Sequence, residues 1–242
     1  MQDPVLIIGA SGTIGSAIAR TLHADGTPVL LHGRTDGDRL RELAGDLSSP
    51  LLTGDLSVEE TAAALPQALS DHTDMLSGVV FAAARPFPHK LTHRTDWSVF
   101  QEQVDSQLKA LHLSLQALRP MLANRDGGAR VVILSTEYVQ GMPPVKIAPY
   151  VAAKSAVTAY ARVIAQEWLK TGVRVHILAP GMVPSALTAD MPAEYLEMVA
   201  EAMPEQTLTA AEDVAGVCRF LMTSAADPLY GTIVPVSRAV RR

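Results

Sequence analysis

The sequence predicts an α/β fold, in which a mostly parallel β-sheet is covered by helices on both faces. Short apolar runs rich in β-branched residues alternate along the chain with longer stretches of helical periodicity. Continuous apolar runs are typical of strands that are buried on both faces, as they are in a parallel sheet. Repeated strand–helix units produce this architecture, because each crossover lays a helix on the sheet.

The expected elements follow one another along the whole chain. Strands are expected at 5–8, 28–32, 51–53, 79–82, 130–134, 173–178 and 232–236. Helices are expected at 16–22, 58–69, 97–122, 150–169 and 211–222. Pro235 favours an edge position for the last strand, because proline has no N–H to donate to a neighbour. No linker, repeat or low-complexity tract divides the sequence, so we expect a single domain over residues 1–242.

A glycine-rich turn, Gly9-Ala10-Ser11-Gly12-Thr13-Ile14-Gly15, joins the first strand to the first helix. Gly9 permits a tight turn, Gly12 lets a pyrophosphate approach the backbone, and Gly15 lets the helix pack closely on the strand. The helix N-terminus offers free N–H groups and the positive end of its dipole to an anion. The spacing differs from the G-x-G-x-x-G dinucleotide fingerprint, and the alternative is a glycine turn without a ligand. Its position between strand and helix favours a phosphate-binding turn.

The residues after the second strand favour NADP(H) over NAD(H). An NAD site usually places an acid about 20 residues beyond the glycines, where it holds the ribose 2′-hydroxyl. Here Gly33 leaves room at that position and Arg34 supplies positive charge. An arginine can hold a 2′-phosphate with its forked guanidinium group. The alternative is that Arg34 is an ordinary solvated loop residue, since Asp36 and Asp38 follow closely.

Tyr150 and Lys154 are four residues apart at the start of a predicted helix, so both side chains leave the same face. An ammonium beside a phenol lowers the phenol pKa, which is normally about 10. A tyrosine tuned in this way can exchange a proton with a carbonyl or alcohol oxygen near neutral pH. This spacing also arises by chance, and the alternative is a surface helix with a half-buried tyrosine and a solvated lysine. The glycine turn at the N-terminus shifts the balance towards a catalytic pair.

Charge and composition exclude several classes of function. The net charge of −5 argues against a broad nucleic-acid-binding surface. No stretch approaches the roughly 18 consecutive apolar residues of a membrane span, so we expect none. The first strand begins by Val5 and leaves no room for a leader, so we expect a cytoplasmic protein. The single Cys218 excludes a disulfide within the chain, and His89 and His93 have no acidic or cysteine partner nearby, so we expect no metal site.

Taken together, these ordered motifs resemble those of the short-chain dehydrogenase/reductase family, in particular its ketoacyl and carbonyl reductases, from Val5 to about Val236. The resemblance implies a Rossmann-like, doubly wound sheet of seven strands in the order 3-2-1-4-5-6-7, with helices on both faces. It also implies a homodimer or a homotetramer, since in this family the helices expected at 97–122 and 150–169 usually pair across a two-fold axis.

The resemblance also implies an NADP(H) site along one rim of the sheet. Asp55-Leu56 matches a pair that contacts the adenine, Pro180 to Val183 matches a turn beside the nicotinamide, and Ser185 replaces a threonine at the carboxamide. Two departures are Phe81-Ala82-Ala83-Ala84, where the family usually has Asn-Asn-Ala-Gly, and Thr13, where its short-chain branch usually has glycine. The expected cofactor-binding residues are Gly9, Ser11, Gly12, Thr13, Ile14, Gly33, Arg34, Asp55, Leu56, Ala82, Ala83, Tyr150, Lys154, Pro180, Gly181, Val183 and Ser185.

The resemblance further implies a set of catalytic residues. Tyr150 and Lys154 match the family's catalytic pair. The strand end Ser135-Thr136 resembles the family's Ser-Ser, whose second hydroxyl polarises the carbonyl. Thr136 takes that position and Ser135 is the fallback, although a strand-end hydroxyl can also bond its own backbone. Gln107 takes the place of an asparagine that holds a water in a proton relay, and the alternative is a plain surface glutamine.

The implied function is an NADP(H)-dependent oxidoreductase that interconverts a ketone or ketoacyl group and a secondary alcohol by hydride transfer. Two segments should shape the substrate pocket, the basic segment 85–94 and a lid at about 185–205. The expected partner is a small carbonyl or alcohol substrate, or an acyl chain on a carrier protein that segment 85–94 would meet. The rival interpretation is a non-catalytic NADP(H)-binding sensor or scaffold. The missing asparagines favour that rival, and the retained tyrosine–lysine pair opposes it.

Overall fold

The computed structural model describes residues 3–238 of the chain. At its centre is a seven-stranded sheet in the order β3-β2-β1-β4-β5-β6-β7. The predicted strand order is confirmed, and all strand pairs in the described part of the chain are parallel, not only most of them. The strands are β1 (Val5–Ile8), β2 (Val29–Gly33), β3 (Leu51–Thr53), β4 (Gly78–Phe81), β5 (Ala129–Leu134), β6 (Val173–Pro180) and β7 (Ile233–Val236).

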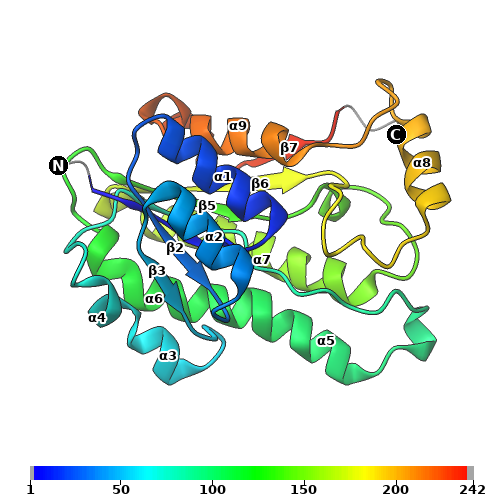
Figure 1. Cartoon of the computed structure of the whole chain (residues 1–242), viewed down its shortest axis with the longest axis horizontal. Helices are drawn as coiled ribbons and strands as arrows, with labels where there is room; N and C mark the ends of the chain where they lie inside the picture. Colours follow the sequence, from blue (N-terminus) through cyan, green and yellow to red (C-terminus); the bar gives the residue numbers. More distant parts are fainter. Residues whose placement is uncertain (1–2, 239–242) are drawn as a thin grey trace.

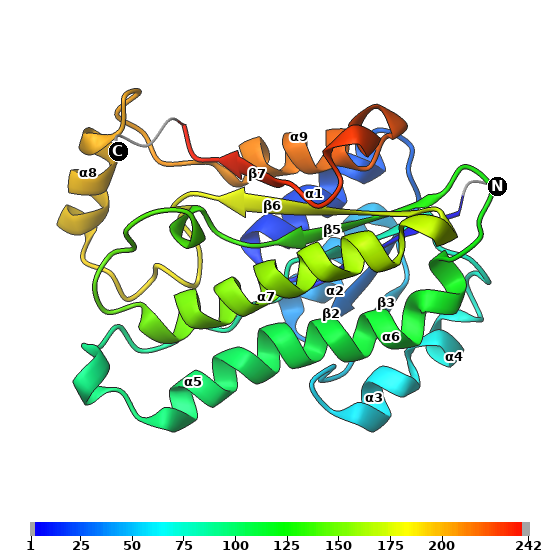
Figure 2. The ribbon, with the colours of Figure 1, turned by 180° about the vertical axis from the view of Figure 1, so that it is seen from behind.

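Helices cover both faces of this sheet. They are α1 (Thr13–Ala24), α2 (Asp38–Leu47), α3 (Glu59–Ala63), α4 (Leu65–Leu69), α5 (Trp97–Val104), α6 (Ala110–Leu122), α7 (Ala148–Glu167), α8 (Ala193–Ala202) and α9 (Ala211–Leu221). In Figure 1, α1, α2 and α9 lie on the face nearer the viewer, and Figure 2 shows α5, α6 and α7 on the opposite face. The α8 segment lies apart from both layers, at one end of the molecule (Figure 1).

Strand side chains alternate between two hydrophobic cores, one on each face of the sheet. In β1, Leu6 and Ile8 join the core beneath α6 and α7. Val5 and Ile7 point the other way, into the core beneath α1, α2 and α9. All four are at most 2% exposed. Burying one such side chain contributes about 1.5–3 kcal/mol, which explains why a continuous apolar run forms a central strand.

Three predicted helices differ in detail from the structure. The helix expected at 58–69 is two short helices, because Pro66, in the first turn of α4, has no N–H with which to continue the first helix. The helix expected at 97–122 is continuous but contains a π turn, Asp105–Lys109, between α5 and α6. It runs two residues beyond Pro120, which lies inside α6. The helix expected from 150 begins at Ala148, with Pro149 in its first turn.

The carboxyl ends of the strands lie along one edge of the sheet. Ile8 at the end of β1 is paired with His32 of β2 and with Phe81 of β4. Leu134 at the end of β5 is paired with Leu178 of β6. The residues that follow these strand ends therefore lie along one rim, and ligands of doubly wound sheets bind at such a rim.

Candidate active site

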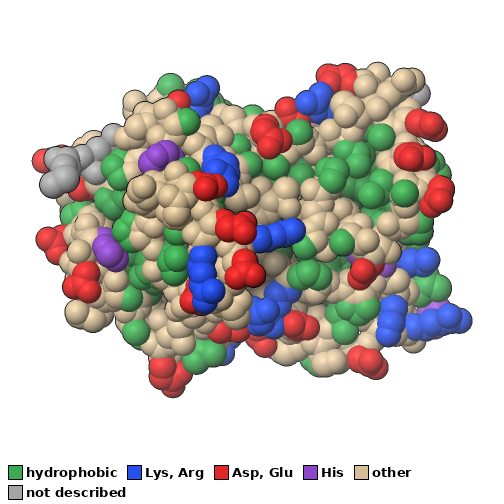
Figure 3. All heavy atoms as spheres, in the orientation of Figure 1, with side chains coloured by type: hydrophobic (Ala, Val, Ile, Leu, Met, Phe, Trp, Pro, Cys, Tyr) green, Lys and Arg blue, Asp and Glu red, His purple; other side chains and the backbone are tan. Residues whose placement is uncertain are grey.

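A cavity of about 410 Å³ lies at this rim, between the strand ends, α7 and the segment that leads into α8. Four residues predicted as catalytic line it: Ser135, Thr136, Tyr150 and Lys154. So do six others predicted to bind the cofactor, namely Ile14, Ala82, Pro180, Gly181, Val183 and Ser185. Figure 3 shows hydrophobic side chains gathered beside α8, with charged side chains around them. The other predicted residues lie outside the cavity lining: Gly9, Ser11, Gly12, Thr13, Gly33, Arg34, Asp55, Leu56, Ala83 and Gln107.

Lys154 is fixed between α7 and the end of β5. Its Nζ donates a hydrogen bond of 2.7 Å to the backbone oxygen of Leu134 and lies 5.9 Å from the centre of the Tyr150 ring. Only 3% of the lysine is exposed. Burial disfavours the charged form and lowers the pKa of Lys154 to about 7. The Lys154 amino group therefore gains and loses its proton near neutral pH.

The pKa of Tyr150 moves in the opposite direction to the one expected from its lysine neighbour. Burial raises the pKa of Tyr150 to about 12, and a hydrogen bond from Thr136 offsets only part of that rise. The physical reason is that desolvation of the phenolate outweighs every nearby favourable contact. In this arrangement the Tyr150 phenol keeps its proton at neutral pH.

The two candidate hydroxyls at the end of β5 have different partners. Thr158 Oγ1 donates to the backbone oxygen of Lys154, at 2.7 Å, so the proton between Ser135 and Thr158 belongs to Ser135. The Ser135 hydroxyl thus donates its only proton to Thr158 Oγ1 of α7, in a hydrogen bond of 2.5 Å. Thr136 instead lies near the Tyr150 phenol, where its hydroxyl acts to lower the tyrosine pKa. Both residues are buried, and of the two hydroxyls only that of Thr136 influences the Tyr150 pKa.

Phe87 forms one wall of the cavity directly against Tyr150. The two rings are nearly parallel, at 10° with centroids 5.5 Å apart, and His89 follows at 4.8 Å from Phe87. The sequence indicated only that segment 85–94 would shape the pocket. Its signal for Phe87 was an aromatic residue between two prolines, Pro86 and Pro88, which restrict the backbone on both sides.

The glycine turn has the geometry of an anion cradle. Gly9 has a φ of +88°, and a Cβ on it would lie 2.7 Å from Ala83 N, so both conformation and space require glycine. A Cβ on Gly15 would collide with the backbone oxygen of Gly9. Gly12 is the N-cap of α1, and no side chain caps the helix. The first N–H groups of α1 are thus available to a phosphate.

Arg34 follows β2 on the same rim and is exposed. Among residues 3–238 it has no ion-pair partner: Asp36 and Asp38, which follow it in the sequence, are paired with Arg41, and Asp55 is paired with Arg85. Arg41 donates two hydrogen bonds to Asp36, of 2.8 and 2.7 Å, and lies 3.8 Å from Asp38. The acidic residues that follow Arg34 in the sequence are therefore engaged by Arg41, and Arg34 remains available to an anion.

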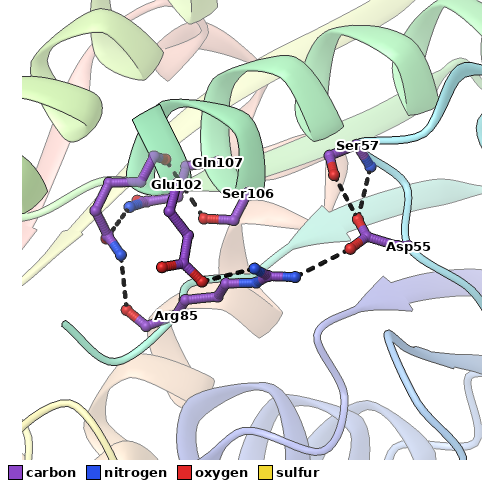
Figure 4. A network of polar contacts seen from close by, with 7 residues as sticks. Asp55, Ser57, Arg85, Glu102, Ser106 and Gln107 are labelled. Atoms are coloured by element: carbon purple, nitrogen blue, oxygen red, sulfur yellow. Dashed lines mark hydrogen bonds and ion pairs between the residues drawn. The ribbon is translucent and has the colours of Figure 1, made fainter. Parts of the chain in front are cut away.

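Asp55 has both carboxylate oxygens engaged (Figure 4). One accepts from the N–H and hydroxyl of Ser57, at 3.0 and 2.6 Å, and the other accepts from Arg85 at 3.0 Å. Burial acts to raise the pKa of Asp55, but Ser57 and the charges of Arg85 and Arg34 outweigh it and hold that pKa below its usual value. Arg85 also pairs with Glu102 at 2.7 Å. Sequence reasoning missed this role of Arg85, which depends on partners 30 and 17 residues away.

Gln107 lies in the π turn and has no exposed surface, which excludes the surface-glutamine alternative. Its Nε2 donates a hydrogen bond of 2.8 Å to Oε1 of Gln103. Its own Oε1 is buried and has no hydrogen-bond partner in the described part of the chain. A buried acceptor of this kind normally meets a donor.

Residues 3–238 contain neither a candidate metal cluster nor a helix that could span a membrane. No group of three or more His, Cys, Asp or Glu side chains is arranged to hold a metal ion. No helix combines the length and apolarity needed to cross a membrane.

Comparison with known proteins shows similarity over nearly the whole chain. Residues 9–238 match the protein family described as enoyl-(acyl carrier protein) reductase. An uncharacterized oxidoreductase of Staphylococcus epidermidis is 32% identical over 192 residues, which are 77% of this chain and 80% of that protein. A 3-oxoacyl-[acyl-carrier-protein] reductase of Rickettsia bellii is 30% identical over 236 residues, 96% of this chain and 94% of that protein.

A solved structure, RhlG of Pseudomonas aeruginosa in an active-site complex with NADP, has the same fold. It superposes with a TM-score of 0.91 at 24% identity, over 98% of this chain and 95% of the other.

Proposed function

Because the chain belongs to the short-chain dehydrogenase/reductase family of oxidoreductases, we propose that it interconverts a ketone or ketoacyl group and a secondary alcohol with NADP(H). Tyr150 acts as the acid/base group. The observation that carries this proposal is the contact of Tyr150 with Thr136, beside the buried Lys154, on the wall of a cavity at the carboxyl ends of the strands.

The residues of the rim fit a dinucleotide phosphate. The uncapped N-terminus of α1 and the turn from Gly9 would hold the pyrophosphate. Arg34, which has no ion-pair partner within residues 3–238, would hold the 2′-phosphate. Asp55-Leu56 would lie at the adenine, and the turn from Pro180 to Ser185, with Ala82 and Ala83, would lie at the nicotinamide. The NADP complex of RhlG supports the same cofactor.

When bound, NADPH supplies a hydride to the substrate carbon. In that direction Tyr150 donates its proton to the developing alkoxide, and Thr136 donates a hydrogen bond to the same oxygen. Lys154, with a pKa of about 7, would hold the nicotinamide ribose and would pass a proton back to the tyrosine. Gln107 takes the place of the family's asparagine in the relay to solvent. A phenol with a pKa of about 12 is protonated at neutral pH, which favours reduction.

The substrate class follows from the cavity wall, which is mostly apolar. Phe87 and Met182 line it, and Leu187, Met191 and Tyr195 of the proposed lid reach it from the other side. Such a lining favours an aliphatic or cyclic carbonyl compound over a sugar. The relative from Rickettsia bellii bears the name of a ketoacyl-carrier reductase, which supports a ketoacyl substrate. Segment 85–94 keeps Lys90 and Arg94 for the anionic tether of a carrier, since Arg85 is paired within the chain.

The test is an NADPH-consumption assay with a panel of ketones and ketoacyl thioesters, each free and carrier-bound. Turnover of at least one member is expected. Faster turnover of carrier-bound thioesters would support the carrier partner, and equal rates would count against it. Tight NADPH binding without turnover of any member would favour the non-catalytic sensor or scaffold instead.

Light scattering of the same samples tests the proposed homodimer or homotetramer.

A further inference from the structure

Two buried glutamines lie against the helix that carries Tyr150 and Lys154. Gln103 is in α5 and Gln107 is in the π turn that follows, and both elements pack on α7. Neither residue has any exposed surface. A side-chain amide donates at nitrogen and accepts at oxygen, and a buried polar atom left unpaired costs about 1–3 kcal/mol. The direction in which each amide faces therefore decides what it can bind.

The backbone oxygen of Arg85 sets both directions. A backbone carbonyl can only accept, so it must receive the nitrogen of Gln103, which donates to it at 3.2 Å. Gln103 then presents its oxygen to Gln107, whose Nε2 donates to it at 2.8 Å. Gln107 is left presenting Oε1, the buried acceptor without a partner within residues 3–238. If the Gln107 amide were flipped, its oxygen would face the oxygen of Gln103, and two acceptors would oppose each other.

The carbonyl that begins this series belongs to a residue fixed on both sides (Figure 4). The Arg85 guanidinium bridges Glu102, at 2.7 Å, and Asp55, at 3.0 Å. Asp55 is in turn held by Ser57. Arg85 therefore ties the segment after β4 to the loop after β3 and to α5. These contacts keep the Arg85 carbonyl in place for Gln103.

We propose that Gln103 is a positioning residue for the carbonyl reaction and acts through Gln107. It holds Gln107 with Oε1 turned out as an acceptor, and this oxygen takes a hydrogen bond from a relay water whose own oxygen accepts from Lys154. Each reductive turnover moves one proton from Tyr150 to the product, and the water supplies its replacement through Lys154. A Gln107 turned the other way would offer N–H groups and orient the water wrongly. This inference rests on the proposed function.

The kinetic test uses variants that keep size and remove hydrogen bonds. Gln103→Met and Gln107→Met should each lower kcat about tenfold, less than the 10²–10⁴ typical of a direct acid/base group, with KM for NADPH unchanged. The double variant should match either single variant, because the two residues act as one unit. Gln101→Met is the matched control on the exposed side of α5, and it should match the wild type, because the Gln101 side chain bonds only Asp105 among residues 3–238. A double variant about a hundredfold slower, or a Gln103→Met enzyme with wild-type kcat, would overturn the proposal.

A second measurement needs neither turnover nor a variant that folds. Neutron diffraction from crystals of the wild-type protein in deuterium oxide should place the deuterons of Gln107 Nε2 on the side of Gln103. Deuterons on the opposite side would reject the inference. The two proposals fail separately: activity retained in Tyr150→Phe rejects the proposed function, whereas loss there with unaltered Gln103→Met kinetics rejects only the role of Gln103.

Discussion

The two ends of the proposed cofactor groove use charge in opposite ways. At the catalytic end, Lys154 is buried and Tyr150 is partly buried, and desolvation shifts the pKa of each towards its neutral form, to about 7 and about 12. At the adenine end, Asp55, Arg85 and Glu102 are partly exposed and neutralise one another through short ion pairs. The pKa of Asp55 accordingly lies below its usual value.

The difference separates reactivity from support. A desolvated group without a counter-charge favours its neutral form, so Lys154 titrates near neutral pH and Tyr150 keeps a proton that it can donate. A network of paired charges keeps its protonation and fixes the backbone that carries it. Variants at the catalytic end should therefore change turnover and its pH dependence. Variants at the adenine end should change cofactor preference and lower the free energy of unfolding only modestly.

Tyr150→Phe is expected to have the largest effect. It removes the proton donor and keeps the ring that stacks on Phe87, so kcat should fall by about 10²–10⁴-fold while NADPH binding is retained. Steady-state turnover and NADPH fluorescence titration check the two parts. Tyr160→Phe on the same helix, which loses only a bond of 3.0 Å to His112, is the control. Similar activity in both variants would mean that the phenol of Tyr150 takes no part in the reaction.

Lys154→Met tests the pH behaviour of the catalytic end. The ordinary pKa of lysine, 10.5, applies to the unfolded chain, and the folded value is about 7. Between these values the unfolded chain binds a proton that the folded chain has released, so the free energy of unfolding rises with pH across this window. The variant should lose that rise, measured as melting temperature from pH 7 to pH 10.

Lys109→Met, which removes a half-exposed lysine 4.0 Å from Glu59, is the matched control and should keep the wild-type slope. A constant offset between Lys154→Met and the wild type at all pH values would show that burial does not depress the lysine pKa.

Arg34→Glu tests the adenine end. Charge-assisted hydrogen bonds contribute roughly 1.5–3 kcal/mol, so KM for NADPH should rise about 10–100-fold, with little change for NADH. Arg39→Glu reverses an exposed charge on the neighbouring α2 and should change the ratio far less. Equal effects of the two reversals would indicate a general field and no direct contact with the 2′-phosphate.

Much of this arrangement could be predicted because it depends on local sequence. The glycine turn between β1 and α1 needs only neighbouring residues, and the resemblance to a known family supplied the strand order. Tyr150 and Lys154 reach the cavity together because one helical turn separates them.

What the sequence could not predict depends on contacts between distant residues. The hydrogen bond that engages Ser135, and so favours Thr136 as the proposed catalytic hydroxyl, is made with Thr158, 23 residues away on another element. The raised pKa of Tyr150 reflects burial by the whole cavity wall, whereas sequence spacing shows only the lysine. The π turn Asp105–Lys109 contains no glycine or proline that would mark an irregularity in the helix.

Arg85→Met should have the smallest effect and tests whether the adenine-end network mainly gives support. It removes two ion pairs whose side chains are 24–48% exposed, and partly exposed pairs contribute about 0–1 kcal/mol each. The free energy of unfolding should fall by about 1 kcal/mol, measured by urea denaturation. Arg41→Met, which removes the more exposed pair with Asp36, should cost less. The substitution keeps the Arg85 backbone carbonyl but removes the guanidinium contacts that hold this carbonyl in place for Gln103. A loss of about 3 kcal/mol or more would mean that the pairs behave as buried ones, and the contrast between the two ends would disappear.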